Sequence, residues 1–191
     1  VALPTDIKGN ILSYVNKDVH IINKKPAYAT SHPVAVVDND AASRNWVWQV
    51  VMDAQNHPVI AMVKINEDKT SHDYYYARWT GNNWKKTFLT NAGGHFHQTP
   101  GIEKCYSGGM AIDEDHTNVV YGSVPVQGNS GEVYEIKKYT IGDDGSITTD
   151  QITRNSEKNN VRPYIIPNSG SSPVRLVWMH GDYYDWIVSK E

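Results

Sequence analysis

A segment of about sixty residues repeats along the chain, and this repeat constrains the fold more than any other feature. The stretch VVMDAQNHPVIAMV (50–63) resembles GMAIDEDHTNVVYGSV (109–124), so that Asp53 corresponds to Asp113, 60 positions later. A third, shorter copy occupies 163–190. The shift of 60 continues beyond these stretches and aligns further pairs: Tyr74 with Tyr134, Arg78 with Lys138, Trp79 with Tyr139 and Thr80 with Thr140.

Each repeat has the pattern of four short strands. A β-branched strand ends in Asp or Asn turn residues, and a second strand such as PVIAMVKI follows. A third strand such as HDYYYARW, a tight turn such as TGNNW and a short fourth strand complete the unit. Period-two alternation with Gly, Asn and Asp punctuation indicates strands, and no stretch has the periodicity of a long amphipathic helix. Four strands at this period are typical of a β-propeller blade, so we predict an all-β propeller of four-stranded antiparallel blades.

The number of blades predicts an incomplete ring. The single predicted domain, 1–191, divides into these approximate blades: 1–43 (partial), 44–92, 106–153 and 161–191 (partial). Propellers typically close with about four to eight blades, whereas this chain supplies about three. We therefore expect the chain to be part of a larger propeller and its partner to be the remaining part, because open sheet edges are a liability.

The composition favours sugar binding over nucleic-acid or membrane binding. The chain has twelve Tyr and six Trp but two Phe, and its formal net charge is -3. Tyr and Trp combine an apolar ring with a polar edge, which suits stacking on sugars as well as packing in a β-rich core. No basic cluster indicates nucleic acid, and no apolar run is long enough to span a membrane.

Several stretches together resemble the ulvan lyase type of polysaccharide lyase, a family of seven-bladed propellers with BNR-like repeats. The stretches that carry the resemblance are RNWVWQVVMDAQNHPVIA (44–61), YSGGMAIDEDHTNVVYGS (106–123), YEIKKYTIGDDGSITTDQIT (134–153), NSEKNNVRPYIIPN (155–168) and VWMHGDYYDW (177–186). The resemblance implies the C-terminal part of such an enzyme. It further implies a protein secreted or exported to the periplasm by a bacterium that degrades acidic, sulfated polysaccharides.

The resemblance also implies a reaction and two catalytic residues. Lyases of this type cleave a glycosidic bond beside a uronic acid by β-elimination, which needs a neutralised carboxylate, a base and an acid. The family's tyrosine and arginine correspond to Tyr28 in KPAYATSHP and Arg44 in ASRNWVW, sixteen positions apart. The alternative is that Tyr28 is a packing residue and Arg44 a surface residue. Since a free tyrosine has a pKa of about 10, a basic Tyr28 requires cations such as Arg44 and His32.

Substrate-binding residues are expected from the same resemblance. They are His32, Tyr75, Tyr76 and His95. The tyrosines belong to HDYYYARW (72–79), where alternation places Tyr75 on the opposite face from Tyr74 and Tyr76. The sequence leaves open which face lines the cleft.

The segment GGHFHQTPGIEKCY (93–106) suggests a metal site. His95 and His97 project to one face of an extended segment, and Cys105 is the chain's only cysteine. Two imidazoles and a thiolate suit a structural metal ion, zinc in preference to calcium, with His180 or an Asp as a fourth ligand. The alternative is a histidine-rich loop with a small buried cysteine. No organic cofactor is expected.

Two further features are expected to be structural. In NNVRPY (159–164), Pro163 disfavours helix for Arg162, so we predict an extended strand entry with a mainly structural arginine; the alternative is that Arg162 contacts an anionic sugar. Trp46 and Trp48 alternate with Val47 and are predicted to share a core-facing side, with stacking on substrate as the alternative.

Three functions compete. The first is β-eliminative cleavage of an acidic, uronate-containing glycan, with the remaining part of the propeller needed for activity. The second is a non-catalytic glycan-binding propeller, which would bind ulvan without forming unsaturated uronate products. A sialidase-like hydrolase ranks third, because the five arginines are widely separated and form no cluster along the sequence.

Overall fold

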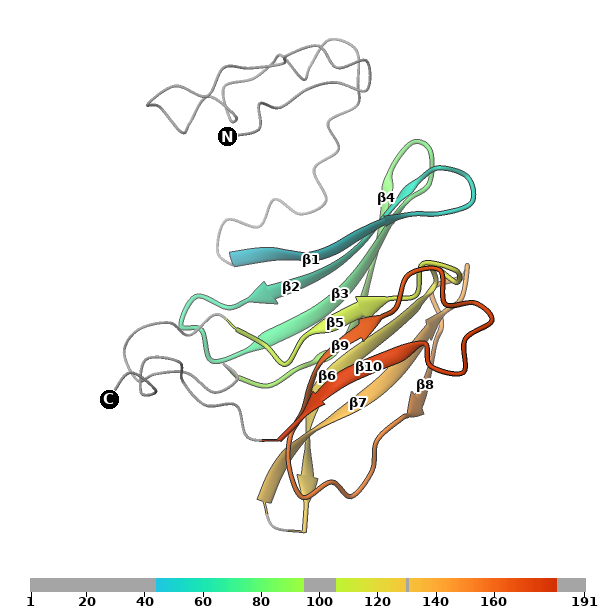
Figure 1. Ribbon diagram of the computed structural model, residues 1–191. Coiled ribbons are helices and arrows are strands. Elements are labelled where there is room, and N and C mark those ends of the chain that lie inside the picture. The colour runs from blue at the N-terminus through green and yellow to red at the C-terminus, as the bar shows by residue number, and fades with distance from the viewer. Residues whose placement is uncertain (1–43, 95–105, 130, 182–191) are drawn as a thin grey trace, which may run out of the picture. The chain divides into compact units, whose positions relative to one another are not determined.

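The computed structural model describes residues 44–94, 106–129 and 131–181 (Figure 1). The chain divides into two units, Val1–Val36 and Val37–Glu191, and all the described strands belong to the second. These strands are β1 (Arg44–Met52), β2 (Pro58–Ile65), β3 (His72–Trp79), β4 (Trp84–Asn91), β5 (Met110–Ile112), β6 (Val119–Gly128), β7 (Gly131–Ile141), β8 (Ile147–Gln151), β9 (Asn160–Ile165) and β10 (Leu176–His180).

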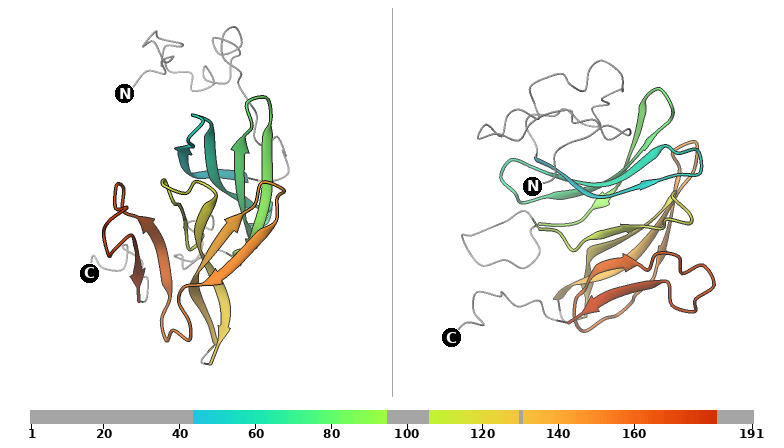
Figure 2. Two further views of the ribbon diagram at one scale, coloured as in Figure 1. Left: turned by 90° about the vertical axis from the view of Figure 1, so that its right-hand side faces the viewer. Right: turned by 45° about the horizontal axis from the view of Figure 1, so that its top comes forward.

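The strands form two four-stranded antiparallel sheets and one antiparallel hairpin. The sheet orders are β1-β2-β3-β4 and β5-β6-β7-β8, and β9 pairs with β10 (Figure 2). The first strands of successive units are neighbours: β1 contacts β5, and β5 contacts β9. Over the described ranges the chain contains no helix and does not close into a ring. The predicted all-β fold of four-stranded antiparallel blades is confirmed.

The core lies between the two four-stranded sheets because facing strands carry apolar side chains on one side. In β3 the side chains buried on this side are Tyr74 and Tyr76, two residues apart, whereas Ala77 is buried on the opposite face with Ile60 and Met62. The facing sheet contributes Met110 and Ile112 to the same cluster. The two sheets therefore stack through one continuous apolar layer, as successive propeller blades do.

Tyr74 joins the two sheets by hydrogen bonds as well as by packing. Its hydroxyl donates to the carbonyl oxygen of Ser123 at 3.0 Å and accepts the amide N–H of Gly109 at 2.9 Å. Burial raises the pKa of Tyr74 well above its ordinary value, so the phenol remains a neutral donor. A Cβ atom at Gly122 would lie 3.2 Å from the Tyr74 ring, which explains glycine at this close approach.

The strand register corrects the alignment of the repeats. Val59 pairs with Arg78 in the first sheet, whereas Val119 in the second sheet pairs with Thr140 and not with Lys138. Equivalent residues of the two repeats are therefore 60 positions apart in the second strand and 62 positions apart in the third. The spacing changes because β6 and β7 are longer than β2 and β3. Because the change is two residues, each side chain keeps its face of the sheet.

Candidate functional site

A β-bulge in β1 places Trp48 at the inner edge of the first sheet. Val47 pairs with Met62 and Gln49 pairs with Ala61, so Trp48 is an extra residue without a partner in β2. Bulges commonly redirect a side chain near functional sites. Trp46 and Trp48 are half-buried and pack against the same core cluster, as the sequence predicted.

A second bulge, in β9, holds Arg162. Val161 pairs with Met179 and Tyr164 pairs with Val177, so Arg162 and Pro163 together oppose one residue of β10. Arg162 has a φ of 56°, in the left-handed region. The predicted extended conformation is therefore wrong: proline disfavours the right-handed helical region for the preceding residue, and the bulge requires the left-handed one instead. A non-glycine residue there costs about 1–3 kcal/mol, and such strain concentrates at functional sites.

The backbone around Arg162 is tightly constrained. Its amide N–H donates to the carbonyl oxygen of Gly108 at 2.7 Å. A Cβ atom at Gly109 would lie 3.0 Å from the Trp48 ring and 3.4 Å from the Cα atom of Arg162. Gly109 also has a φ of 105°, so both its conformation and its surroundings require glycine. These contacts fix the position from which the arginine side chain extends.

The guanidinium of Arg162 contacts two aromatic rings. Its central carbon is 5.1 Å from the ring centre of Trp48 and 5.7 Å from that of Tyr106. Trp46 contacts Tyr106 edge to face, with ring centres 5.4 Å apart. Within the part of the chain that the structure describes, no carboxylate pairs with Arg162. We call Trp46, Trp48, Tyr106 and Arg162 the arginine–aromatic cluster.

The arginine–aromatic cluster is assembled from three blades. Trp48 lies on β1, Tyr106 precedes β5 and Arg162 lies on β9, and β5 contacts both β1 and β9. Indole and phenol rings can stack on the C–H faces of a sugar, while a guanidinium binds a carboxylate or sulfate through paired hydrogen bonds. This combination suits an acidic sugar.

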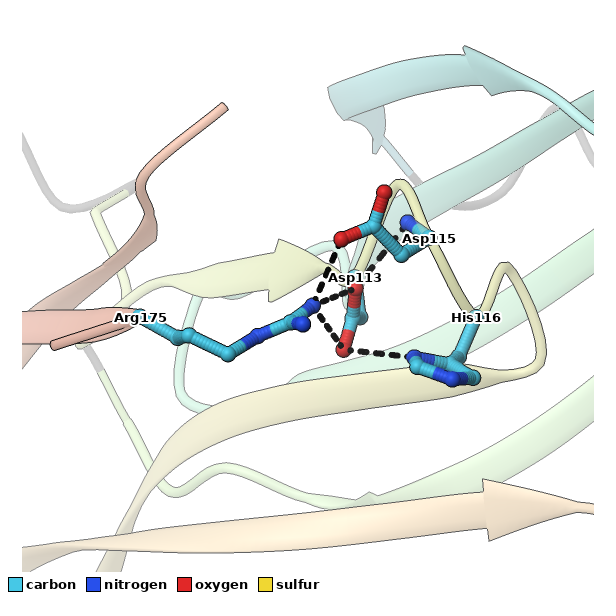
Figure 3. A network of polar contacts seen from close by, with 4 residues as sticks. All are labelled: Asp113, Asp115, His116 and Arg175. Atoms are coloured by element: carbon cyan, nitrogen blue, oxygen red, sulfur yellow. Dashed lines mark hydrogen bonds and ion pairs between the residues drawn. The ribbon is translucent and has the colours of Figure 1, made fainter. Parts of the chain in front are cut away.

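The cluster contrasts with a neighbouring arginine whose charge is fully engaged (Figure 3). Arg175, from the β9–β10 connection, donates through Nη2 to both carboxylate oxygens of Asp113, at 3.1 and 3.3 Å, and to Asp115 at 2.8 Å. His116 lies 3.3 Å from Asp113 through Nδ1. Asp113 also accepts the backbone N–H of Asp115, which confirms DEDH as a turn. Arg175 thus fastens the hairpin to the second sheet.

One comparison with known proteins found a family model that resembles the N-terminal part of the chain. Residues 8–92 match the model of a BNR repeat-containing family. The matched segment covers all of β1–β4 and residues 8–43 before them. No curated protein and no solved structure matched the chain. The BNR match supports the BNR-repeat part of the predicted resemblance, while the narrower resemblance to ulvan lyases remains a prediction.

Most of the predicted site residues lie outside the part of the chain that the structure describes. They are Tyr28, His32, His95, His97 and Cys105. Arg44 is the first residue of β1 and pairs through its backbone with Ile65. The catalytic, substrate-binding and zinc assignments for these residues therefore stay predictions.

The described ranges bear on the suggested metal site and on membrane insertion. There, no group of three or more His, Cys, Asp or Glu side chains could hold a metal ion. His180, the suggested fourth zinc ligand, places Nδ1 2.8 Å from Oδ1 of Asn160. No helix in the same ranges is long and apolar enough to cross a membrane.

The two predicted substrate-binding tyrosines lie on opposite faces of β3. Tyr75 contacts Phe88 edge to face at 5.4 Å, and Nζ of Lys86 lies 5.3 Å from the centre of its ring. Tyr76 is buried and faces the second sheet. Arg44 pairs with Ile65, and Ile65 pairs with His72 at the start of β3. Tyr76 lies four residues further along β3, about 13 Å from His72, and is therefore well away from Arg44.

Sequence reasoning did not identify Tyr106 and treated Arg162 as mainly structural. The one local signal was the Asn-Val-Arg-Pro run, because an arginine before a proline within a strand has restricted backbone geometry. The stacking of Arg162 on Trp48 and Tyr106 joins residues from three blades. No spacing in the sequence contains that information.

Proposed function

We propose that this chain is part of a polysaccharide lyase that binds an acidic, uronate-containing glycan through the arginine–aromatic cluster. The observation that carries the proposal is Arg162, which stacks on Trp48 and Tyr106 and has no carboxylate partner among the described residues. An arginine held by strained backbone without an anion is well prepared to bind one from outside. The BNR-repeat match agrees with a glycan-related role.

The proposed reaction assigns the proton transfers to residues taken from the lyase resemblance. Arg44 neutralises the uronate carboxylate, which makes the neighbouring C5 proton acidic. Tyr28, as a phenolate stabilised by neighbouring cations, removes that proton. The electron pair of the broken C5–H bond forms the C4–C5 double bond, the C4–O bond breaks, and the leaving oxygen takes a proton from the Tyr28 phenol or from water. The arginine–aromatic cluster holds a sugar unit of the same chain.

The second candidate function is glycan binding without cleavage. It is favoured by the arginine–aromatic cluster itself, since stacking and charge pairing require no base. Mixing the complete propeller with ulvan distinguishes the two. A rise in the ultraviolet absorbance of unsaturated uronate supports the lyase, whereas binding without that rise supports the binding protein.

Replacing Arg162 with glutamine is expected to weaken binding to ulvan by about tenfold or more, because hydrogen bonds to a charged group are worth about 1.5–3 kcal/mol. Glutamine retains part of the side-chain length but lacks the charge and the planar fork. The dissociation constant is measured by titration calorimetry at fixed ionic strength.

Arg154→Gln is the matched control, because Arg154 is exposed and its replacement removes the same charge. Its affinity for ulvan should remain that of the parent protein. If Arg162→Gln binds ulvan as tightly as the parent, or if both variants lose the same affinity, the arginine–aromatic cluster is not the glycan site.

A further inference from the structure

A cavity of about 270 Å³ lies between the first and second sheets, away from the arginine–aromatic cluster. It opens where the β1–β2, β3–β4 and β7–β8 turns meet, at the end of the first sheet opposite to Arg44. Its lining residues are Gln55, His57, Tyr76, Arg78, Thr80, Lys85, Thr87, Asn118, Ile141, Gly142 and Asp143. Both sheets therefore contribute to its wall.

Four side chains of the wall form a block on one face of β3 and β4. Tyr76 pairs with Thr87, and Arg78 pairs directly with Lys85. Like charges at directly opposite positions of an antiparallel pair are destabilising. The arrangement therefore favours an anion between or beside the two cations.

The carboxylates nearby compensate this charge only in part. Asp53 lies 2.8 Å from Nη2 of Arg78 and also accepts its Nε–H. Asp143 lies 3.7 Å from Nη1 of Arg78, and its side chain is fully exposed. Lys85 donates to the backbone carbonyl of Asp143, which carries no net charge. Asp53 thus engages one of the two cations. Among the described residues no carboxylate forms an ion pair with the Lys85 ammonium, although the Asp144 carboxylate is near enough to interact with it electrostatically.

The neutral part of the wall also presents donors. Among the described residues, neither the hydroxyl of Tyr76 nor that of Thr87 has a hydrogen-bond partner. Burial raises the pKa of Tyr76 to about 12, so its phenol keeps its proton at neutral pH and can donate. An ammonium, a guanidinium and two hydroxyl groups therefore face one small space.

We propose that this cavity binds an oxyanion, the sulfate or carboxylate group of a single sugar unit, through Lys85, Arg78 and Tyr76. Its volume lies below the roughly 300–1,000 Å³ of sites for larger ligands, which suits one group and not a polymer segment. The inference goes beyond the proposed function, because these residues lie outside the arginine–aromatic cluster and take no part in the elimination. Nε and Nη2 of Arg78 both contact Oδ2 of Asp53, which holds the guanidinium in place for the ligand.

The test follows the backbone amide signals of Gly142 and Gly145 by NMR in the full chain during titration at constant ionic strength. The probes are sodium sulfate, glucose 6-sulfate, glucuronate and glucose. Saturable shifts are expected with the anionic probes and none with glucose. Tighter binding of glucose 6-sulfate or glucuronate than of sulfate identifies a sugar-borne anion, whereas equal binding identifies a free oxyanion as the ligand.

Adjacent residues supply matched controls for the proposed contacts. Lys85→Ala is expected to weaken binding of glucose 6-sulfate by about tenfold, since it removes a charged donor. Lys86→Ala removes the same charge from the opposite face, beside Tyr75, and should change binding by less than about twofold. Tyr76→Phe should weaken binding and Tyr75→Phe should not.

Two results would overturn the inference. One is a linear, non-saturating response to every anionic probe in the parent protein. The other is an equal loss of affinity in Lys85→Ala and Lys86→Ala, which would indicate general attraction to positive charge. Circular dichroism verifies that each variant remains folded. Neither result depends on the binding of ulvan to Arg162.

Discussion

Replacing Asp53 with alanine is expected to lower the free energy of unfolding by about 2–4 kcal/mol, because it leaves several groups without partners. Oδ1 of Asp53 accepts the backbone N–H groups of Gln55 and His57, at 2.9 and 2.8 Å, and thereby closes the β1–β2 turn. Oδ2 binds Arg78 at 2.8 Å. The Asp53 side chain is 2% exposed and that of Arg78 is 32% exposed, so the loss is smaller than for a fully buried ion pair.

The controls for Asp53→Ala separate its contacts. Asp143→Ala removes the fully exposed carboxylate near Arg78 and should change stability by less than about 0.5 kcal/mol. Asp53→Asn retains an oxygen for the two amides and should lie between the parent and Asp53→Ala. Urea denaturation measures all three variants. Equal stability of Asp53→Ala and Asp143→Ala would show that the turn does not depend on this carboxylate.

The same carboxylate makes stability depend on pH. Burial opposes ionisation of Asp53, but hydrogen bonds from the His57 amide, Arg78 and the Gln55 amide outweigh it and hold its pKa below the ordinary value. Because the pKa of Asp53 is lower in the folded than in the unfolded state, ionised Asp53 stabilises the fold. Its contribution to the free energy of unfolding is complete above about pH 4, the unfolded pKa, and is lost as the pH falls through the folded pKa. The stability difference between the parent protein and Asp53→Asn should therefore shrink as the pH falls below about 4.

Replacing Tyr28 with phenylalanine in the complete propeller is expected to slow the cleavage of ulvan by about 10²–10⁴-fold, the range for loss of a general acid or base. Phenylalanine retains the ring but has no hydroxyl to exchange the C5 proton. The affinity for ulvan should change little, because binding is proposed to depend on the arginine–aromatic cluster. The initial rate is measured from the absorbance of the unsaturated uronate product.

Tyr164→Phe is the control for Tyr28→Phe. Tyr164 is 56% exposed on β9, so removing its hydroxyl should leave the cleavage rate unchanged. Turnover by Tyr28→Phe at the rate of the parent would assign the base to another residue. A parent protein that binds ulvan and forms no unsaturated product would establish the non-catalytic alternative.

The sequence could predict the sheets because their determinants are local. Alternating side chains, Asp and Asn in the β1–β2 turns, and glycine at the hairpins specify four strands in each repeat. The sequence also placed Tyr75 on the opposite face from Tyr74 and Tyr76, since this follows from the strand period alone. Which face meets the second sheet required the structure, because both faces of β3 carry aromatic rings.

Register and bulges are the features that sequence alignment could not supply. The shift of 60 residues holds for Val59 and Val119 but not for the partners of these residues, Arg78 and Thr140. The extra residue Trp48 and the bulge at Arg162 likewise depend on how each strand pairs with its neighbour. Pairing is a property of two strands, so one strand's sequence does not contain it.

By itself, the sequence determined an all-β chain of repeated four-stranded units rich in Tyr and Trp, since strand period and turn chemistry act over a few residues. The tertiary structure alone decided which cations remain available. Arg175 is neutralised by the carboxylates of the preceding blade, whereas Arg162 meets two aromatic rings and no described carboxylate. The physical reason is that an arginine's charge is compensated by whatever packs against it, and in this fold those neighbours come from other blades.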